Sequence, residues 1–195
     1  MITYTSIKKC SIPFLLAALV LVFPQRAFAQ MYVSGLLGAD FGGDSGCQNV
    51  SNCQDRKLNE GVAVGSLGLI GFEEELAYAK DFFGSAPGLS TNVITIMTNV
   101  MVAPAIGPVH PYALAGVGLI KTHVEFASSA LLSTTNNNFG WDIGGGAVVF
   151  LVPHIGLRGD LRYFHALQEL KVSGFTFDQQ KLDFGRAAAA LVLSF

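Results

Sequence analysis

Hydrophobic and polar side chains alternate along residues 141–165 of the chain. In the second half of this stretch, Arg158, Asp160 and Arg162 fall on one face of an extended strand, and the positions between them are mostly apolar or glycine. A helix would scatter these charges around its circumference, so the pattern predicts a strand. The first half alternates in the same way, and the short link at 152–154 predicts an antiparallel hairpin with one apolar and one charged face.

Similar alternation recurs along the rest of the chain, although the phase is ambiguous in the second of the predicted strands. The connections between successive strands alternate between long polar stretches and short turns that contain Gly or Pro. This asymmetry is typical of outer-membrane barrels, which have short periplasmic turns and longer surface loops, and an even strand number lets a sheet close without an edge. The predicted strands cover about residues 32–42, 62–70, 72–80, 92–103, 111–125, 141–151, 155–165 and 181–195, and the predicted long loops cover 43–60, 81–91, 128–138 and 167–180.

The first 29 residues have the pattern of a secretory signal peptide. Lys8 and Lys9 precede an apolar segment at 12–23, and Ala27 and Ala29 form a small-x-small cleavage site. The apolar segment is too short for a spanning helix, which leaves an uncleaved interfacial anchor as the alternative. We therefore predict export, with cleavage after residue 29 and a single domain over residues 30–195.

The composition favours a membrane protein over a soluble one. The chain is 51% hydrophobic and only 13% charged, about half the usual ~25% for a soluble domain. Its mean hydropathy is +0.46, yet beyond the N-terminal segment it lacks the run of about 18 apolar residues that a spanning helix needs. A β-barrel produces this combination because its lipid-facing residues are diluted by alternation. The net charge of −2 and the absence of a basic patch argue against nucleic-acid binding.

Three stretches resemble a known family. The segments TNVITIMTNVMVAP, HPYALAGVGLIKT and GWDIGGGAVVFLVPHIGLRGDLRYFH are similar to those of small outer-membrane β-barrel proteins of the OmpA/OmpX type, the porin-like outer membrane protein β-barrel domain group. The resemblance implies an all-β fold, an eight-stranded antiparallel transmembrane barrel with short periplasmic turns and four longer surface loops, in the bacterial outer membrane. It also implies that the final strand, which ends on Phe195, is recognised by the outer-membrane assembly machinery.

The charged residues on the inner faces of these strands are candidates for a site inside the barrel. An eight-stranded barrel is just wide enough for side chains to fill it, and buried charges must pair. We predict a salt-bridged plug in preference to an ion-selective constriction. The residues expected to form it are Glu73, Glu75, Asp142, Arg158, Asp160, Arg162 and Arg186.

Two cysteines lie in the first predicted long loop. Cys47 and Cys53 are close in sequence, and an exported protein meets an oxidising compartment, so we predict a disulfide between them. Two thiols without nearby histidines are too few for a metal site, and the sequence contains no cofactor motif.

His165 is the residue on which an enzymatic alternative depends. Some eight-stranded outer-membrane barrels are lipid A deacylases with a His, a Ser two residues later and a downstream Glu, but here Leu167 replaces the Ser. Without a nucleophile we expect no enzyme. A soluble lipocalin-like binder would require the opposite in–out pattern.

We expect a structural or surface-interaction role, with a small diffusion channel as the alternative. The expected partners are outer-membrane lipid and lipopolysaccharide, the assembly machinery, and a surface ligand at the loops, because loops on a rigid scaffold carry function.

Overall fold

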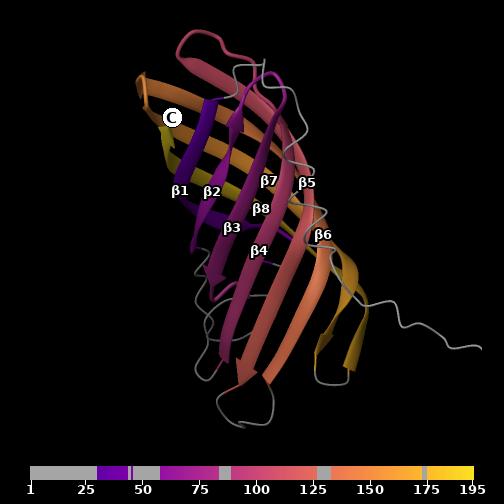
Figure 1. Ribbon diagram of the computed structural model, residues 1–195. Helices are drawn as coiled ribbons and strands as arrows, with labels where there is room; N and C mark the ends of the chain where they lie inside the picture. The colour runs from indigo at the N-terminus through magenta and orange to yellow at the C-terminus, as the bar shows by residue number, and fades with distance from the viewer. Residues whose placement is uncertain (1–29, 44, 46–57, 84–88, 127–132, 173–174) are drawn as a thin grey trace, which may run out of the picture.

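Eight antiparallel strands close into a barrel in the computed structural model, which describes residues 30–43, 45, 58–83, 89–126, 133–172 and 175–195 (Figure 1). The strands are β1 (Gln30–Phe41), β2 (Leu58–Leu67), β3 (Gly71–Lys80), β4 (Leu89–Val102), β5 (Val109–Phe126), β6 (Ser133–Val152), β7 (Ile155–Val172) and β8 (Phe175–Ser194). They follow one another around the barrel in sequence order. The predicted all-β class and strand number are confirmed. No helix in the described ranges is long and apolar enough to cross a membrane.

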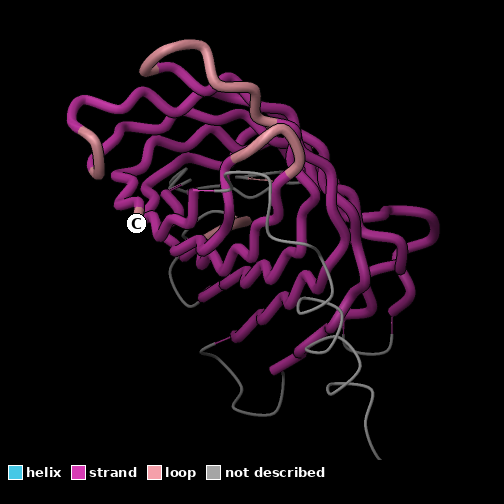
Figure 2. The backbone as a smooth tube through the Cα atoms, turned by 45° about the horizontal axis from the view of Figure 1, so that its top comes forward, coloured by secondary structure: helices cyan, strands magenta, loops and turns pink. Residues whose placement is uncertain are grey.

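The first and last strands close the barrel. β1 and β8 pair from Tyr32 opposite Ser194 to Phe41 opposite Gly185. The backbone N–H of Phe195 also donates to the carbonyl oxygen of Met31 at 2.9 Å. Every strand therefore has a partner on both sides, as lipid requires, and the strands wrap around a single axis (Figure 2).

The two ends of the barrel differ in their connections. At one end, which we call the turn end, residues 68–70, 103–108 and 153–154 join successive strands. At the opposite end, the loop end, the strands are joined through residues 42–57, 81–88, 127–132 and 173–174. This alternation of connections around the barrel is the one expected from the sequence.

Several strand boundaries differ from the prediction. β6 begins at Ser133, within the loop predicted at 128–138. β7 reaches Val172 and β8 begins at Phe175, so most of the loop predicted at 167–180 is instead the end of a β7–β8 hairpin. The register of β7 on β8 shifts after His165, which interrupts the simple alternation there. Backbone pairing beyond the apolar band needs no apolar side chains, and this explains why hydrophobic periodicity missed these extensions.

The two faces of each strand are sharply distinct. On β7, Leu157 and Leu161 expose 51% and 60% of their surface on the outer wall, whereas Arg158 and Arg162 are buried in the interior. The faces predicted for the β6–β7 hairpin are therefore confirmed. On β2, where the sequence left the inner and outer faces ambiguous, Val62 is exposed on the outer wall, as are the leucines of β7.

Apolar side chains pack inside the barrel at both of its ends. A loop-end cluster contains Phe82, Val93, Met97, Ile120, Phe164, Leu182 and Phe184. A turn-end cluster contains Tyr32, Leu67, Met101, Tyr112, Leu114, Val148 and Val192. The interior charges lie between these two clusters.

Candidate functional site

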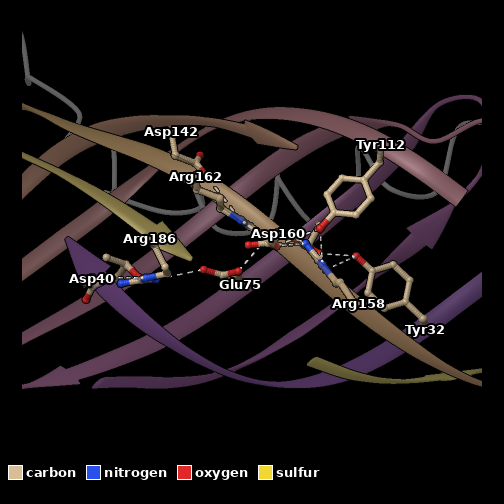
Figure 3. Close-up of polar contacts among 11 residues, drawn as sticks. Tyr32, Asp40, Glu75, Tyr112, Asp142, Arg158, Asp160, Arg162 and Arg186 are labelled. Carbon is tan, nitrogen blue, oxygen red and sulfur yellow. Dashed lines mark hydrogen bonds and ion pairs between the residues drawn. The ribbon is translucent and has the colours of Figure 1, made fainter. Parts of the chain in front are cut away.

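The interior site is built by strands on opposite walls of the barrel. β3 and β7 lie across from each other, because three strands separate them in either direction around the closed sheet. Alternation turns Glu73 on β3 and Arg158, Asp160 and Arg162 on β7 toward the same space. Arg158 and Arg162 form ion pairs with Glu73 across the interior instead of lining a separate wall. Figure 3 shows the three β7 side chains together with Glu75, which also comes from β3.

Arg158 joins the turn-end side of this network. Its guanidinium forms ion pairs with Glu73 and with Asp160, the latter at 2.7 Å. Its Nε donates to the Tyr112 hydroxyl at 2.7 Å, and its charge lies 4.8 Å from the centre of the Tyr112 ring. The Tyr32 hydroxyl donates to Glu73 as well. Two tyrosines thus connect the ionic network to the turn-end cluster.

Arg162 lies at the centre of the network. Its guanidinium nitrogens lie 2.7 Å from a Glu73 oxygen, 2.9 Å from Glu75, 3.0 Å from Asp160 and 3.5 Å from Asp142. The residue is only 3% exposed. One buried cation therefore contacts four carboxylates on three strands.

Arg186 on β8 extends the network toward the loop end. It forms ion pairs with Asp40 at 2.8 Å and Glu75 at 3.3 Å, and it donates to the Thr95 hydroxyl at 3.1 Å. Its guanidinium carbon lies 4.7 Å from the centre of the Phe164 ring in the loop-end cluster. The ionic layer is therefore continuous with apolar packing on both sides.

The geometry leaves little room for solvent at this level. Among the ionised side chains of the network, Asp160 is the most exposed at 8%. Three guanidinium groups face five carboxylates, so the described interior holds more acid than base when all of these groups are ionised. The ion-pair network therefore holds opposite walls of the barrel together and fills the space between them.

All seven residues predicted for the interior lie together in this network. Sequence reasoning missed Asp40, Tyr32, Tyr112 and Thr95 as members. For Asp40 and Tyr32 a signal existed, since both lie on the polar face of the first predicted strand. Tyr112 and Thr95 lie on strands whose inner faces carry no charge in the predicted spans, so nothing in the sequence set them apart.

Other predicted features lie elsewhere. Cys47, Cys53 and the signal peptide over residues 1–29 fall outside the described residues, so the disulfide and the cleavage remain predictions. Phe195 lies at the turn end, next to the closing β1–β8 pair, with 73% of its surface exposed. Its recognition by assembly machinery also remains a prediction.

His165 lies on the outer wall of β7. Its Nδ1 is 2.5 Å from an Asp183 carboxylate oxygen on β8, and its ring centre is 5.3 Å from that of Trp141. Among the described residues, His165 makes no hydrogen bond to a serine or cysteine. Within those same ranges, no group of three or more His, Cys, Asp and Glu side chains is arranged to hold a metal ion.

Three solved structures with the same fold are distant from this chain in sequence. Neisserial surface protein A matches with a TM-score of 0.61 and 16% identity over 88% of this chain and 100% of its own. A major outer membrane protein from Thermus thermophilus matches with a TM-score of 0.60 and 15% identity over 86% of this chain and 100% of its own. Ail, the attachment invasion locus protein of Yersinia pestis, matches with a TM-score of 0.52 and 11% identity over 86% of this chain and 97% of its own. At these identities the matches establish the fold alone, and no curated protein matched the sequence.

The family itself is established by the sequence as a whole. Residues 12–195 match the model of the outer membrane protein β-barrel domain, which confirms the resemblance seen in the three stretches above. A closed eight-stranded barrel with an apolar outer wall and a charged interior is the structure that such a sequence needs in order to reside in lipid. The chain therefore belongs to the outer membrane protein β-barrel domain family and is a bacterial outer-membrane barrel.

Proposed function

We propose that this protein is a closed, non-enzymatic barrel that acts as a structural element of the outer membrane and holds its loops at the surface for interaction. The observation that carries the proposal is the position of Arg162, a buried cation bound to carboxylates on β3, β6 and β7. A permeation path would have to pass this point, and an ion passing it would have to break charge-assisted hydrogen bonds in a space of low dielectric constant.

The alternative function is a small diffusion channel. A channel of this size needs inward charges that leave a hydrated path between them. The interior charges instead lie within ion-pair distance of one another. On the loop-end side of these charges, the barrel is filled by the apolar cluster that contains the Phe82 and Phe184 rings, which are 4.9 Å apart. These contacts favour a filled barrel.

The non-enzymatic part of the proposal rests on the surroundings of His165. The His165–Asp183 pair orients an imidazole, but activation of a nucleophile needs a hydroxyl or thiol within hydrogen-bonding distance of that imidazole. No described serine or cysteine hydroxyl or thiol bonds to it. We propose that the pair instead helps to anchor the outer wall beside Trp141, where a polar-tipped aromatic ring is favoured near a membrane interface.

Conductance across planar bilayers tests the closed barrel. The purified, folded protein should produce no stable current steps, while an open porin inserted under the same conditions should. Folding of the inserted sample is checked by the gel shift between unheated and boiled protein. Reproducible, ion-selective steps from the unmutated protein would support the channel instead.

A deletion strain tests the surface role. Complementation with the full chain should restore adhesion and envelope integrity, whereas a variant shortened within residues 46–57 and 127–132 should restore integrity but not adhesion. Because the shortened variant keeps all eight strands, its amount in the outer membrane serves as the control. Loss of small-solute uptake without loss of adhesion or integrity would contradict the proposal.

A further inference from the structure

A hollow lies on the outer wall where β3, β4 and β5 approach the loop end. It is lined by Tyr78, Asn92, Ile94, Lys121 and His123, and its volume is about 420 Å³. Strand register explains the grouping, because Tyr78, Ile94 and Lys121 are opposite one another across the three strands, and Asn92 pairs with His123 one step nearer the loops. All of these side chains project toward the membrane and not into the barrel.

A second hollow adjoins it on the other side of Tyr78. It has a volume of about 640 Å³, and its lining includes Leu37, Leu58, Glu60 and Lys80. The second hollow is mainly apolar, whereas Lys121 and Asn92 line the first. Tyr78 forms the ridge between them.

The two lysines at these hollows have no protein partner within the described part of the chain. Lys80 and Lys121 are exposed, and neither forms an ion pair or a hydrogen bond with any described residue. The Oδ1 atom of Asn92, on β4 between them, is buried, has no hydrogen-bond partner there, and can accept a hydrogen bond from a lysine ammonium. The spacing is about 10 Å across two strand intervals, which long lysine side chains can bridge toward a common ligand.

The position of the lysines along the strands identifies the kind of ligand. Directly toward the turn end, Leu76, Ile96 and Leu119 are exposed on the outer wall, so Lys80 and Lys121 lie where the apolar band ends. A lysine at the bilayer midplane of such a barrel costs about 2–4 kcal/mol, but near the interface that cost falls to about 0–1 kcal/mol. At that level the anionic groups available to an outward-facing ammonium are lipid phosphates.

We propose that Tyr78, Lys80, Asn92 and Lys121 form a binding site for the phosphate group of a phosphorylated outer-leaflet lipid. The phosphate accepts charge-assisted hydrogen bonds from the two ammonium groups. An acyl chain of the same lipid lies along the apolar wall beside Ile94. Lys80 lines the second hollow together with Glu60, whose carboxylate repels the phosphate. The phosphate therefore lies on the β3–β5 side of Tyr78, and the Lys80 ammonium reaches it across the Tyr78 ring. This site goes beyond the proposed role of the loops and is independent of whether the barrel conducts.

Native mass spectrometry of the full barrel in detergent, with diphosphorylated lipid A and its dephosphorylated form as probes, tests the site. The unmutated protein should retain diphosphorylated lipid A and bind the dephosphorylated form at least tenfold more weakly. The double variant Lys80→Gln/Lys121→Gln should lose the same factor for the diphosphorylated lipid, and Glu60→Gln should bind it more tightly. The control Lys171→Gln removes one positive charge from β7, a strand separated from β5 by β6, and should leave binding unchanged.

The other outcomes are equally decisive. Equal retention of the two lipids, or equal retention by the unmutated protein and the double variant, overturns the proposal. Displacement of the lipid by an equal concentration of inorganic phosphate would show a free-anion site and also overturn it. The gel shift of each variant establishes that it is folded, and Lys121→Gln alone, with an intermediate loss, provides a second measurement on the same hollow.

Discussion

Replacing Arg162 by Ala should strongly destabilise the barrel. Arg162 contacts four carboxylates, of which Glu73 and Asp160 keep an ion pair with Arg158 after the change. Asp142 keeps none, because its only ion pair among the described residues is with Arg162. The variant therefore leaves a carboxylate buried without a cation, and breaking a buried pair in this way costs about 3–5 kcal/mol.

The ion pairs also predict how the stability cost of Arg158→Ala compares with that of Arg162→Ala. Arg158→Ala leaves Glu73 and Asp160 in contact with Arg162, so no carboxylate of the network loses its last cation. We expect Arg158→Ala to cost less than Arg162→Ala. Adding Asp142→Asn to Arg162→Ala should recover part of the loss, because the two sites are in contact and their effects are not additive.

The assay is denaturant unfolding of the barrel in lipid vesicles, followed by tryptophan fluorescence. Trp141 is the only tryptophan in the chain, and it lies on the outer wall next to Tyr163, so its emission reports transfer between lipid and water. Gly159→Ala is the control, because its added methyl group meets no atom within 4 Å, and it should change the free energy of unfolding by no more than about 0.5 kcal/mol. An Arg162→Ala barrel as stable as the unmutated one to within about 1 kcal/mol would refute the reasoning on buried charge.

Three further predictions address the wall and the closing strand. Leu161→Arg should impair folding into vesicles by about 2–4 kcal/mol because it places a charge in the hydrocarbon, while Tyr163→Arg, nearer the interface, should cost much less in the same measurement. Gly146→Ala should destabilise the barrel by about 1–3 kcal/mol in denaturant titration, since the added methyl would lie 2.1 Å from a backbone oxygen, whereas Gly159→Ala meets nothing within 4 Å and should be neutral. Deleting Phe195 should lower the amount of barrel assembled in cells, measured in isolated outer membranes, without changing spontaneous folding into detergent; an unchanged amount in cells would contradict its role as an assembly signal.

Much of the fold could be predicted because lipid imposes a simple rule on every strand. On β7 the alternation of Leu157, Arg158, Gly159 and Asp160 determines both the strand and the direction of each side chain. The rule weakens where the strands leave the lipid. The β7–β8 hairpin beyond His165 therefore appeared to be a loop in the sequence, although its backbone is paired.

The interior site could be predicted in composition but not in its pairings. The alternation of side chains along a strand places Arg186 and Asp40 inside the barrel. Which acid each arginine meets depends on how far neighbouring strands are shifted relative to one another in the closed sheet. Tyr112 illustrates the limit, because it belongs to the network only through its contacts with Arg158 and Asp160, on a strand two positions away around the barrel.

The interior ion pairs also constrain how the protein assembles. Arg186 and Asp40 are 146 positions apart in the chain, and Arg158 and Glu73 are 85 apart. Contacts of such long sequence separation form slowly, because the entropy of closing the intervening chain is lost before they contribute stability. The interior charges stay exposed until the first and last strands pair, so a partly formed barrel gains little stability from their ion pairs. Once formed, the Arg186–Asp40 pair must be broken before the first and last strands can separate, which favours a barrel that assembles late and then persists for a long time.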